Sequence, residues 1–221
     1  MKPKIMLILP FLFCFVLAGP AVGQTTVTDQ VKKVVDQVVS IVTDKELKKP
    51  ENENKRQQKL KNVIGAIFDY GEMARLSLGR NWRGRTPAEQ KEFVPLLEDV
   101  LRRAYARKIE SYNNEKIVYL GETNDGKYAE VKSKVITPKG DEYSINYRLM
   151  NKGGKWVVYD VVIEGVSLVA NYRTQFDRII REKGYNELVN KLKARSGEIK
   201  GPKESGLPIS YALLRLGIRS G

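Results

Sequence analysis

Apolar residues recur at helical spacing in the first part of the chain. Valines at three- and four-residue steps over positions 27–42 predict an amphipathic helix, with Thr26 or Thr28 as its N-cap. Lysines followed by Pro50 indicate where this helix ends. A second apolar stripe, over positions 60–68, predicts another helix. The chain is therefore expected to begin with a helical layer.

Two further helices are marked by their N-terminal capping sequences. Asp69 is followed three residues later by Glu72, and Thr86 is followed at the same spacing by Glu89. This spacing places side-chain acceptors where the free N–H groups of a first helical turn lie. After Thr86 a long apolar face continues toward Tyr112, which predicts the longest helix of the protein.

The hydrophobic spacing changes to alternation at Ile117. Four segments are typical of strands, and turn sequences of hairpin length separate them: 117–123, 127–137, 141–150 and 155–163. Short turns of this kind predict an antiparallel meander. In the last strand Val157, Tyr159, Val161 and Ile163 are expected to share one face. The intervening positions are also mostly apolar, so we expect this strand to be covered on both sides.

Helical spacing returns over 166–184 and again over 185–195, and the glycines and prolines of 196–221 predict a flexible tail. The order of elements predicts an α+β fold, in which N- and C-terminal helices pack on a four-stranded antiparallel meander sheet. The expected domain spans 24–195. Its apolar sheet face and amphipathic helices can enclose an apolar cavity or close into a dry core, and the pattern leaves both possibilities open.

The N-terminus has the pattern of a secretory signal. Lys2 and Lys4 precede an uncharged run at 5–18, and small residues at 21–23 form a cleavage site, which makes 1–23 a signal peptide. As a helix the apolar run would span about 21 Å, less than the roughly 30 Å of a bilayer core. An uncleaved membrane anchor remains the alternative reading.

The composition excludes several classes of catalytic site and metal site. The chain of 221 residues has no histidine and one cysteine, Cys14, which excludes Ser-His-Asp and Cys-His catalysis and His-ligated zinc. No phosphate loop or dinucleotide fingerprint is present, so we expect no cofactor and no metal. The formal net charge is +13, and loss of the two lysines in 1–23 leaves 37 − 26 = +11. An exported basic protein meets anionic lipid headgroups and does not ordinarily meet nucleic acid.

Two sequence blocks carry a family resemblance. The first runs from FDYGEMAR at 68–75 through LGRNWR at 78–83, and the second from GKWVVYDV at 154–161 to NYRTQF at 171–176. In these blocks the chain resembles the MlaC family, the periplasmic phospholipid-binding components of an ABC transport system, also called toluene-tolerance proteins. The resemblance covers roughly 27–195.

The resemblance implies a periplasmic carrier without enzymatic activity. Such a protein moves phospholipid between an outer-membrane lipoprotein complex and an inner-membrane MCE protein with its ABC transporter, and we expect it to be a monomer. A hopanoid-associated branch of the same family remains an alternative. So do an α+β enzyme that uses Asp160 with a tyrosine as acid or base, and an interaction module with a dry interior.

The candidate site follows from the elements expected to surround the cavity. The residues that we expect to contact lipid have apolar or aromatic side chains on those elements: Tyr105, Tyr147, Tyr159, Val161, Val169, Tyr172 and Phe176. Arg83 and Arg173 are candidates for contact with a headgroup or with a partner protein. Core packing for the first group, and a solvated surface for the second, are the competing interpretations.

Overall fold

The computed structural model describes residues 25–198. The expected signal peptide, 1–23, and 199–221 of the expected tail lie outside the described residues. Within the described part the elements follow in this order: α1 (Val27–Thr43), η1 (Pro50–Asn52), α2 (Glu53–Gly65), α3 (Tyr70–Leu78), η2 (Gly79–Trp82), α4 (Pro87–Glu110), β1 (Lys116–Asn124), β2 (Tyr128–Ile136), β3 (Glu142–Lys152), β4 (Lys155–Ile163), β5 (Val166–Ser167), α5 (Leu168–Lys183) and α6 (Tyr185–Glu198).

The strands form one antiparallel sheet in chain order, β1-β2-β3-β4-β5. The expected α+β meander is confirmed, but the expectation of four strands is wrong because β5 adds a fifth. Val166 was expected to be helical and instead pairs with Ile163 of β4. The connection is a two-residue turn in which Glu164 has a φ of 50° and Gly165 a φ of 77°. Positive φ at both positions is typical of tight hairpin turns.

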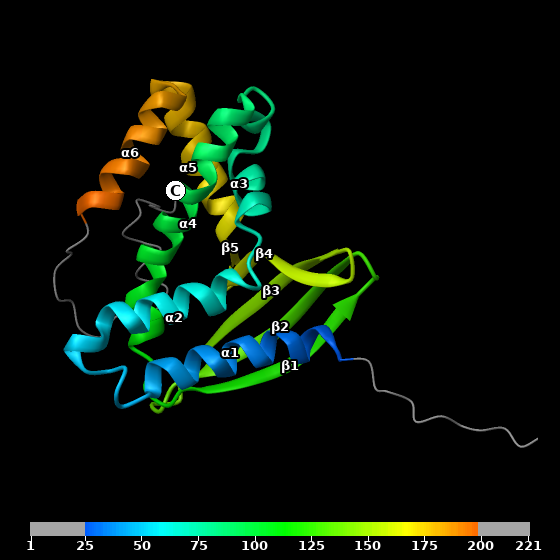
Figure 1. The fold of residues 1–221 in the computed structure, drawn as a ribbon. Coiled ribbons are helices and arrows are strands. Elements are labelled where there is room, and N and C mark those ends of the chain that lie inside the picture. Colours follow the sequence, from blue (N-terminus) through cyan, green and yellow to red (C-terminus); the bar gives the residue numbers. More distant parts are fainter. Residues whose placement is uncertain (1–24, 199–221) are drawn as a thin grey trace, which may run out of the picture.

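The first helix lies across one face of the sheet (Figure 1). Thr26 and Asp29 form the capping box that starts α1, and Val27 and Val31 are buried against the strands. The Glu122 carboxylate of β1 accepts hydrogen bonds of 2.6 Å from both the N–H and the hydroxyl of Thr28. These contacts fix the start of α1 over β1 and β2.

The helices α3 to α6 form a separate bundle beside the sheet (Figure 1). Asp69 caps α3 by accepting from Glu72 N–H, and Thr86 and Glu89 form the capping box of α4, as expected. The last helix continues to Glu198, so the first three residues assigned to the tail, 196–198, are helical. We call the buried residues of this bundle the helical cluster: Met73, Ala74, Leu78, Phe93, Leu97, Val100, Leu101, Val169, Tyr172, Phe176, Tyr185, Leu188, Val189 and Leu192.

A second group of buried residues lies between the sheet and α1. We call it the sheet-side cluster: Val27, Val31, Ile67, Ala129, Val131, Leu149, Trp156, Val158, Val161, Ile163 and Leu168. The segment before α3 joins the two clusters, because Val158 of β4 donates to Ile67 O and accepts from Asp69 N–H, each at 2.8 Å. Strand β4 thus has neighbours along both edges, and its residues are buried on both faces as expected.

Candidate functional site

A β-bulge in β4 decides which side chains face the helices. Arg148 of β3 pairs with Asp160, but the next residue, Leu149, pairs with Val158. Tyr159 is therefore the extra residue of the bulge, and the alternation expected in this strand is interrupted there. Val158 joins the sheet-side cluster together with Val161. A single-sequence alternation rule places these two residues on opposite faces.

The site residues expected from the sequence fall into two groups and one exception. On the sheet side, Val161 is buried in the cluster and Tyr147 packs against it. Tyr159 packs elsewhere, with its ring edge-on to that of Tyr128 at 6.0 Å between centroids. Because Tyr128 is exposed and pairs outside the cluster, Tyr159 is not brought together with the other candidates.

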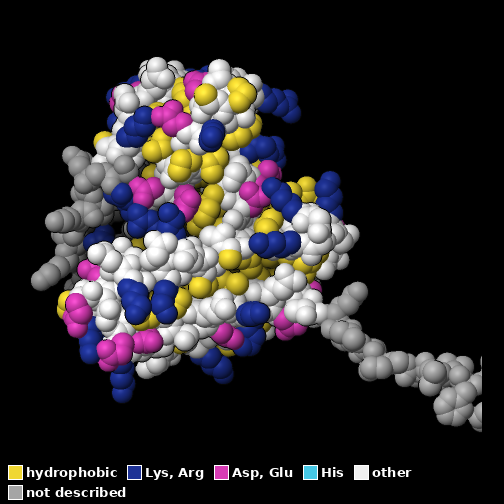
Figure 2. Space-filling model, in the orientation of Figure 1, with side chains coloured by type: hydrophobic (Ala, Val, Ile, Leu, Met, Phe, Trp, Pro, Cys, Tyr) yellow, Lys and Arg dark blue, Asp and Glu magenta, His cyan; other side chains and the backbone are white. Residues whose placement is uncertain are grey.

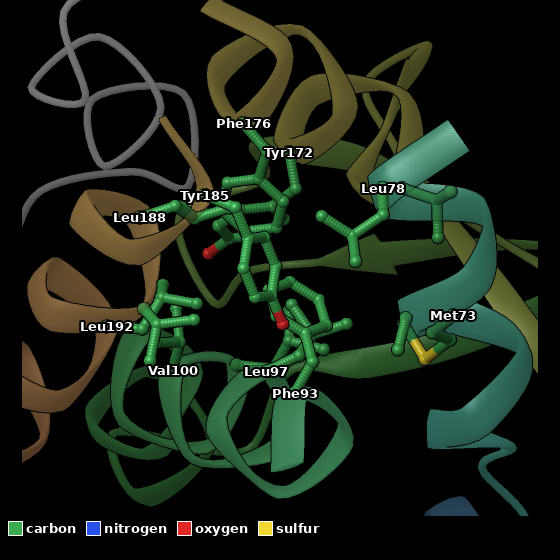
Figure 3. Close-up of a cluster of buried hydrophobic side chains, with 14 residues drawn as sticks. Met73, Leu78, Phe93, Leu97, Val100, Tyr172, Phe176, Tyr185, Leu188 and Leu192 are labelled. Carbon is green, nitrogen blue, oxygen red and sulfur yellow. The ribbon is translucent and has the colours of Figure 1, made fainter. Parts of the chain in front are cut away.

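The remaining aromatic candidates lie in the helical cluster. Figure 3 shows Tyr172 and Phe176 of α5 pointing toward Phe93 of α4, between the side chains of α6 and those of α3. The Phe176 ring lies 5.7 Å from Phe93, edge-on, and 5.5 Å from Tyr172. Val169 is buried in the same cluster. These rings lie in the offset and edge-on arrangements that aromatic pairs prefer.

Tyr105 connects the two groups. It lies in the C-terminal half of α4 and packs against both the helical and the sheet-side cluster, as does Phe68. Burial raises the pKa of the Tyr105 hydroxyl, and the neighbouring Tyr172 raises it further. The joint between the two clusters is therefore apolar but carries hydroxyl groups.

Two hollows of the described part of the molecule lie away from the space between α1 and the sheet. The first, about 370 Å³, is a cleft between α4, α5 and α6 with an apolar floor and a charged rim: Val100, Tyr172, Gln175, Phe176, Arg178, Ile179, Glu182, Lys183, Leu188, Lys191 and Leu192. The second, about 480 Å³, is a shallow depression along the polar side of α1. The cavity expected under the helices stays a prediction. Figure 2 shows hydrophobic side chains reaching the surface beside α2, flanked by Lys and Arg.

Another tyrosine, Tyr119 of β1, was not among the residues singled out from the sequence. It packs against the sheet-side cluster, and its hydroxyl is buried without a hydrogen-bond partner in the part of the chain that the structure describes. Burial raises its pKa, with smaller contributions from Tyr147 and Asp36. A buried hydroxyl that lacks a partner costs on the order of 1–3 kcal/mol. Its inward position in a strand of alternating hydrophobicity is the sequence feature from which it could have been predicted as a site residue.

Asp160 has a structural position. It is 3% exposed and accepts hydrogen bonds from the Ser167 hydroxyl at 2.6 Å, Val169 N–H at 3.1 Å and Arg148 at 3.3 Å. Two of these donors belong to the start of α5, so the carboxylate stabilises the first turn of that helix. The hydrogen bonds that this carboxylate accepts stabilise the fold, and no tyrosine hydroxyl is among these partners.

The two arginine candidates lie near the end of α3. Arg83, after η2, is exposed. The side chain of Arg173 lies against Gly79, where an added Cβ would come 2.9 Å from the arginine Cδ. Beside it, Arg80 forms a bidentate ion pair of 3.0 Å with Asp177 of α5. The segment around Gly79 thus fastens η2 to α5.

The described residues contain no cluster of three or more His, Cys, Asp or Glu that could hold a metal ion. Among the described helices, none combines the length and the apolar character needed to cross a bilayer. The family model described as MlaC protein matches residues 32–194.

The chain belongs to the MlaC family. The toluene tolerance protein Ttg2D of Pseudomonas putida is 28% identical over 156 residues, which cover 70% of this chain and 72% of that protein. The intermembrane phospholipid transport system binding protein MlaC of Haemophilus influenzae is 21% identical over 192 residues, 85% of this chain and 90% of the relative. The resemblance inferred from the two sequence blocks is thereby confirmed.

A solved member of similar structure is a phospholipid-binding protein from Ralstonia solanacearum, in complex with a phospholipid. It superposes with a TM-score of 0.68 at 28% identity, and the match covers 75% of this chain and 94% of the other. The α+β architecture of this chain is therefore that of an MlaC-type phospholipid-binding structure.

Proposed function

We propose that this protein is a periplasmic carrier that binds a phospholipid and moves it between the two membranes. The observation that carries the proposal is the match over 94% of a chain solved with a phospholipid. The intermembrane phospholipid transport system for which the Haemophilus influenzae relative is named supports the same role. Export through the signal peptide 1–23 is part of the proposal.

The acyl chains would lie at the joint between the sheet-side cluster and the helical cluster. There Tyr105 packs against both clusters, with Tyr147 and Val161 on one side and Tyr172 on the other. Val169 and Phe176 belong to the same helical wall. We leave Tyr159 out of the proposed lining because it packs on Tyr128 instead.

The energetics explain why a carrier of this kind is needed. Each CH₂ group brought into water costs about 0.8 kcal/mol, so one 16-carbon chain costs on the order of 12 kcal/mol. An apolar interior replaces burial in the bilayer with burial in protein, and the free-energy difference between the two compartments can then be small. Direction must come from the partner complexes.

Partner contacts extend the proposal to the surface. Arg83 and Arg173 lie at the end of the helical bundle and would contact a phospholipid headgroup or a partner protein. The expected partners are the inner-membrane MCE and ABC transporter complex and the outer-membrane lipoprotein complex, each engaged by a monomer. A hopanoid cargo is the alternative, and its mass distinguishes it from a phospholipid.

The test is to purify the full chain from the periplasm of a bacterial host and to identify extracted lipid by mass spectrometry. We expect one phospholipid-sized species in stoichiometric amount. Ile145→Trp, on the cluster face of β3, should reduce the lipid recovered several-fold at unchanged helix content. The matched control is Val118→Trp on the opposite face of β1, where its partner is Lys134. Recovery of no lipid, or of a hopanoid alone, contradicts the proposal.

A further inference from the structure

Tyr119 occupies a boundary between the apolar interior and the protein surface. It pairs with Ser133 across the β1–β2 ladder, so both side chains face the helices. Two groups contribute to the electrostatic environment of its hydroxyl: Tyr147, on the inner side of β3, and Asp36, which is exposed on α1. The hydroxyl is thus within electrostatic reach of the inner side of the sheet and of the exposed side of α1.

Among the tyrosines of the described residues, Tyr119 is the one whose hydroxyl is buried with no hydrogen-bond partner. Tyr112 donates to the backbone oxygen of Glu115 at 3.0 Å, and Tyr185 donates to that of Glu89 at 3.3 Å. Ser133, directly opposite Tyr119, uses its hydroxyl on Ile145 O. Because a buried donor without an acceptor is unfavourable, its most economical explanation is an acceptor that arrives with a ligand.

The chemistry of a phospholipid supplies such an acceptor at this depth. Its ester carbonyls lie between the acyl chains and the charged headgroup, which is the same order as apolar cluster, Tyr119 and polar flank in the protein. Asp29 and Asp36 border the depression along α1, together with Lys33 and with Lys32, which is paired with Asp36 at 2.6 Å. Lys33 offers positive charge to a phosphate on the solvent side.

We propose that the hydroxyl of Tyr119 donates a hydrogen bond to an ester carbonyl of the bound lipid. This inference rests on the proposed function and adds to it a specific polar anchor. Burial raises the pKa of Tyr119, so the group keeps its proton, and remains a donor, throughout the pH range of the periplasm. Tyr119 would then select lipids with ester linkages.

The experiment compares two lipids with one difference between them. The delipidated full chain is titrated with dipalmitoyl phosphatidylglycerol and with the dihexadecyl ether analogue of the same headgroup, by displacement of a fluorescent phospholipid. The ether lacks the carbonyl acceptor. We expect the wild type to bind the ester about tenfold more tightly, which corresponds to about 1.4 kcal/mol. Tyr119→Phe should bind both lipids with the affinity that the wild type has for the ether.

A matched control and a second readout separate this role from a structural one. Tyr112→Phe removes a hydroxyl that already has a backbone acceptor, so it should keep the ester preference and lower the stability of the lipid-free protein. Tyr119→Phe removes an unpaired donor and should leave that stability equal or higher. An ester preference that persists in Tyr119→Phe overturns the anchor alone. A wild type that binds neither lipid overturns the proposed function as well.

Discussion

The two buried clusters of this protein are built differently. The helical cluster contains interlocked rings around Phe93, which is fully buried, and outer ties such as Arg85 stacked at 4.5 Å over Tyr185. The sheet-side cluster consists mainly of valines and other aliphatic residues, with partly buried tyrosines at its margin and an unpaired hydroxyl at Tyr119. The difference indicates a rigid scaffold beside an adaptable interior.

This contrast is physically reasonable for a carrier. A ligand that must enter and leave needs a wall that can move, whereas the elements that hold this wall need to stay in place. Aromatic rings in edge-on contact resist displacement because each is surrounded by matched neighbours. A mainly aliphatic face under one helix, α1, can separate from that helix with fewer interactions lost. We therefore expect the sheet side to change most when lipid binds.

The largest expected effect is at the centre of the helical cluster. Phe93→Ala removes a fully buried ring and should lower the free energy of unfolding by about 3–5 kcal/mol. Ile145→Ala, at the partly buried margin of the sheet-side cluster, should cost clearly less. Urea denaturation of the lipid-free proteins measures both. Equal losses at the two sites would remove the distinction between scaffold and adaptable wall.

The next effect concerns pH. Burial raises the pKa of Tyr147 to about 12, whereas a tyrosine in an unfolded chain titrates near ~10. Between these pH values the unfolded state has lost a proton that the folded state keeps, so stability falls as pH rises. The contribution of this group is at most about 1.4 kcal/mol per pH unit.

The Tyr147→Phe variant isolates that contribution. Its stability should fall less steeply above pH 10 than that of the wild type, as measured by denaturation at several pH values. Tyr70 and Tyr185, on the helical side, also have pKa values raised to about 12, mainly by burial, and they act in the same direction. The stability of the Tyr147→Phe variant should therefore still fall with rising pH, but less steeply. An unchanged slope would mean that Tyr147 already reaches solvent.

An effect of comparable size is expected at the turn that fastens η2 to α5. Gly79 has a φ of 54° and a ψ of −124°, which a residue with a side chain adopts only with strain, and an added Cβ would meet Arg173. Gly79→Ala should cost about 1–3 kcal/mol. Gly65→Ala, in α2, has open space around its Cβ and should be neutral or slightly stabilising. Thermal unfolding of the two variants provides the comparison.

The parts of this fold that could be predicted are those that local chemistry determines. The capping residues Thr26, Asp69 and Thr86 each start the helix expected of them, because a cap satisfies N–H groups only three residues away. The alternation of the strands and the buried character of β4 are also local patterns. The two blocks that resemble the MlaC family are also continuous stretches of sequence, so they could be recognised without the fold.

The remainder depends on distant partners. Tyr159 leaves its expected face because of a bulge, and the bulge is defined by pairing with Arg148 and Leu149 on another strand. Strand β5 is defined by the pairing of Val166 with Ile163 across a turn. The buried, unpaired state of the Tyr119 hydroxyl depends on the residues that surround it in the fold, so the sequence alone does not predict it. The volume left between side chains is set by packing of the whole interior, and no local pattern determines it.

The smallest effect tests whether surface ties contribute to the rigidity of the scaffold. Arg80 pairs with Asp177 through three hydrogen bonds, but its side chain is 76% exposed. Exposed ion pairs contribute about 0.2–1 kcal/mol, and salt screens them. Arg80→Ala should therefore lower stability by no more than this, and the loss should shrink in high salt. A larger, salt-independent loss would show that the packing of η2 on α5, rather than charge, holds the bundle, and that the scaffold extends to its surface.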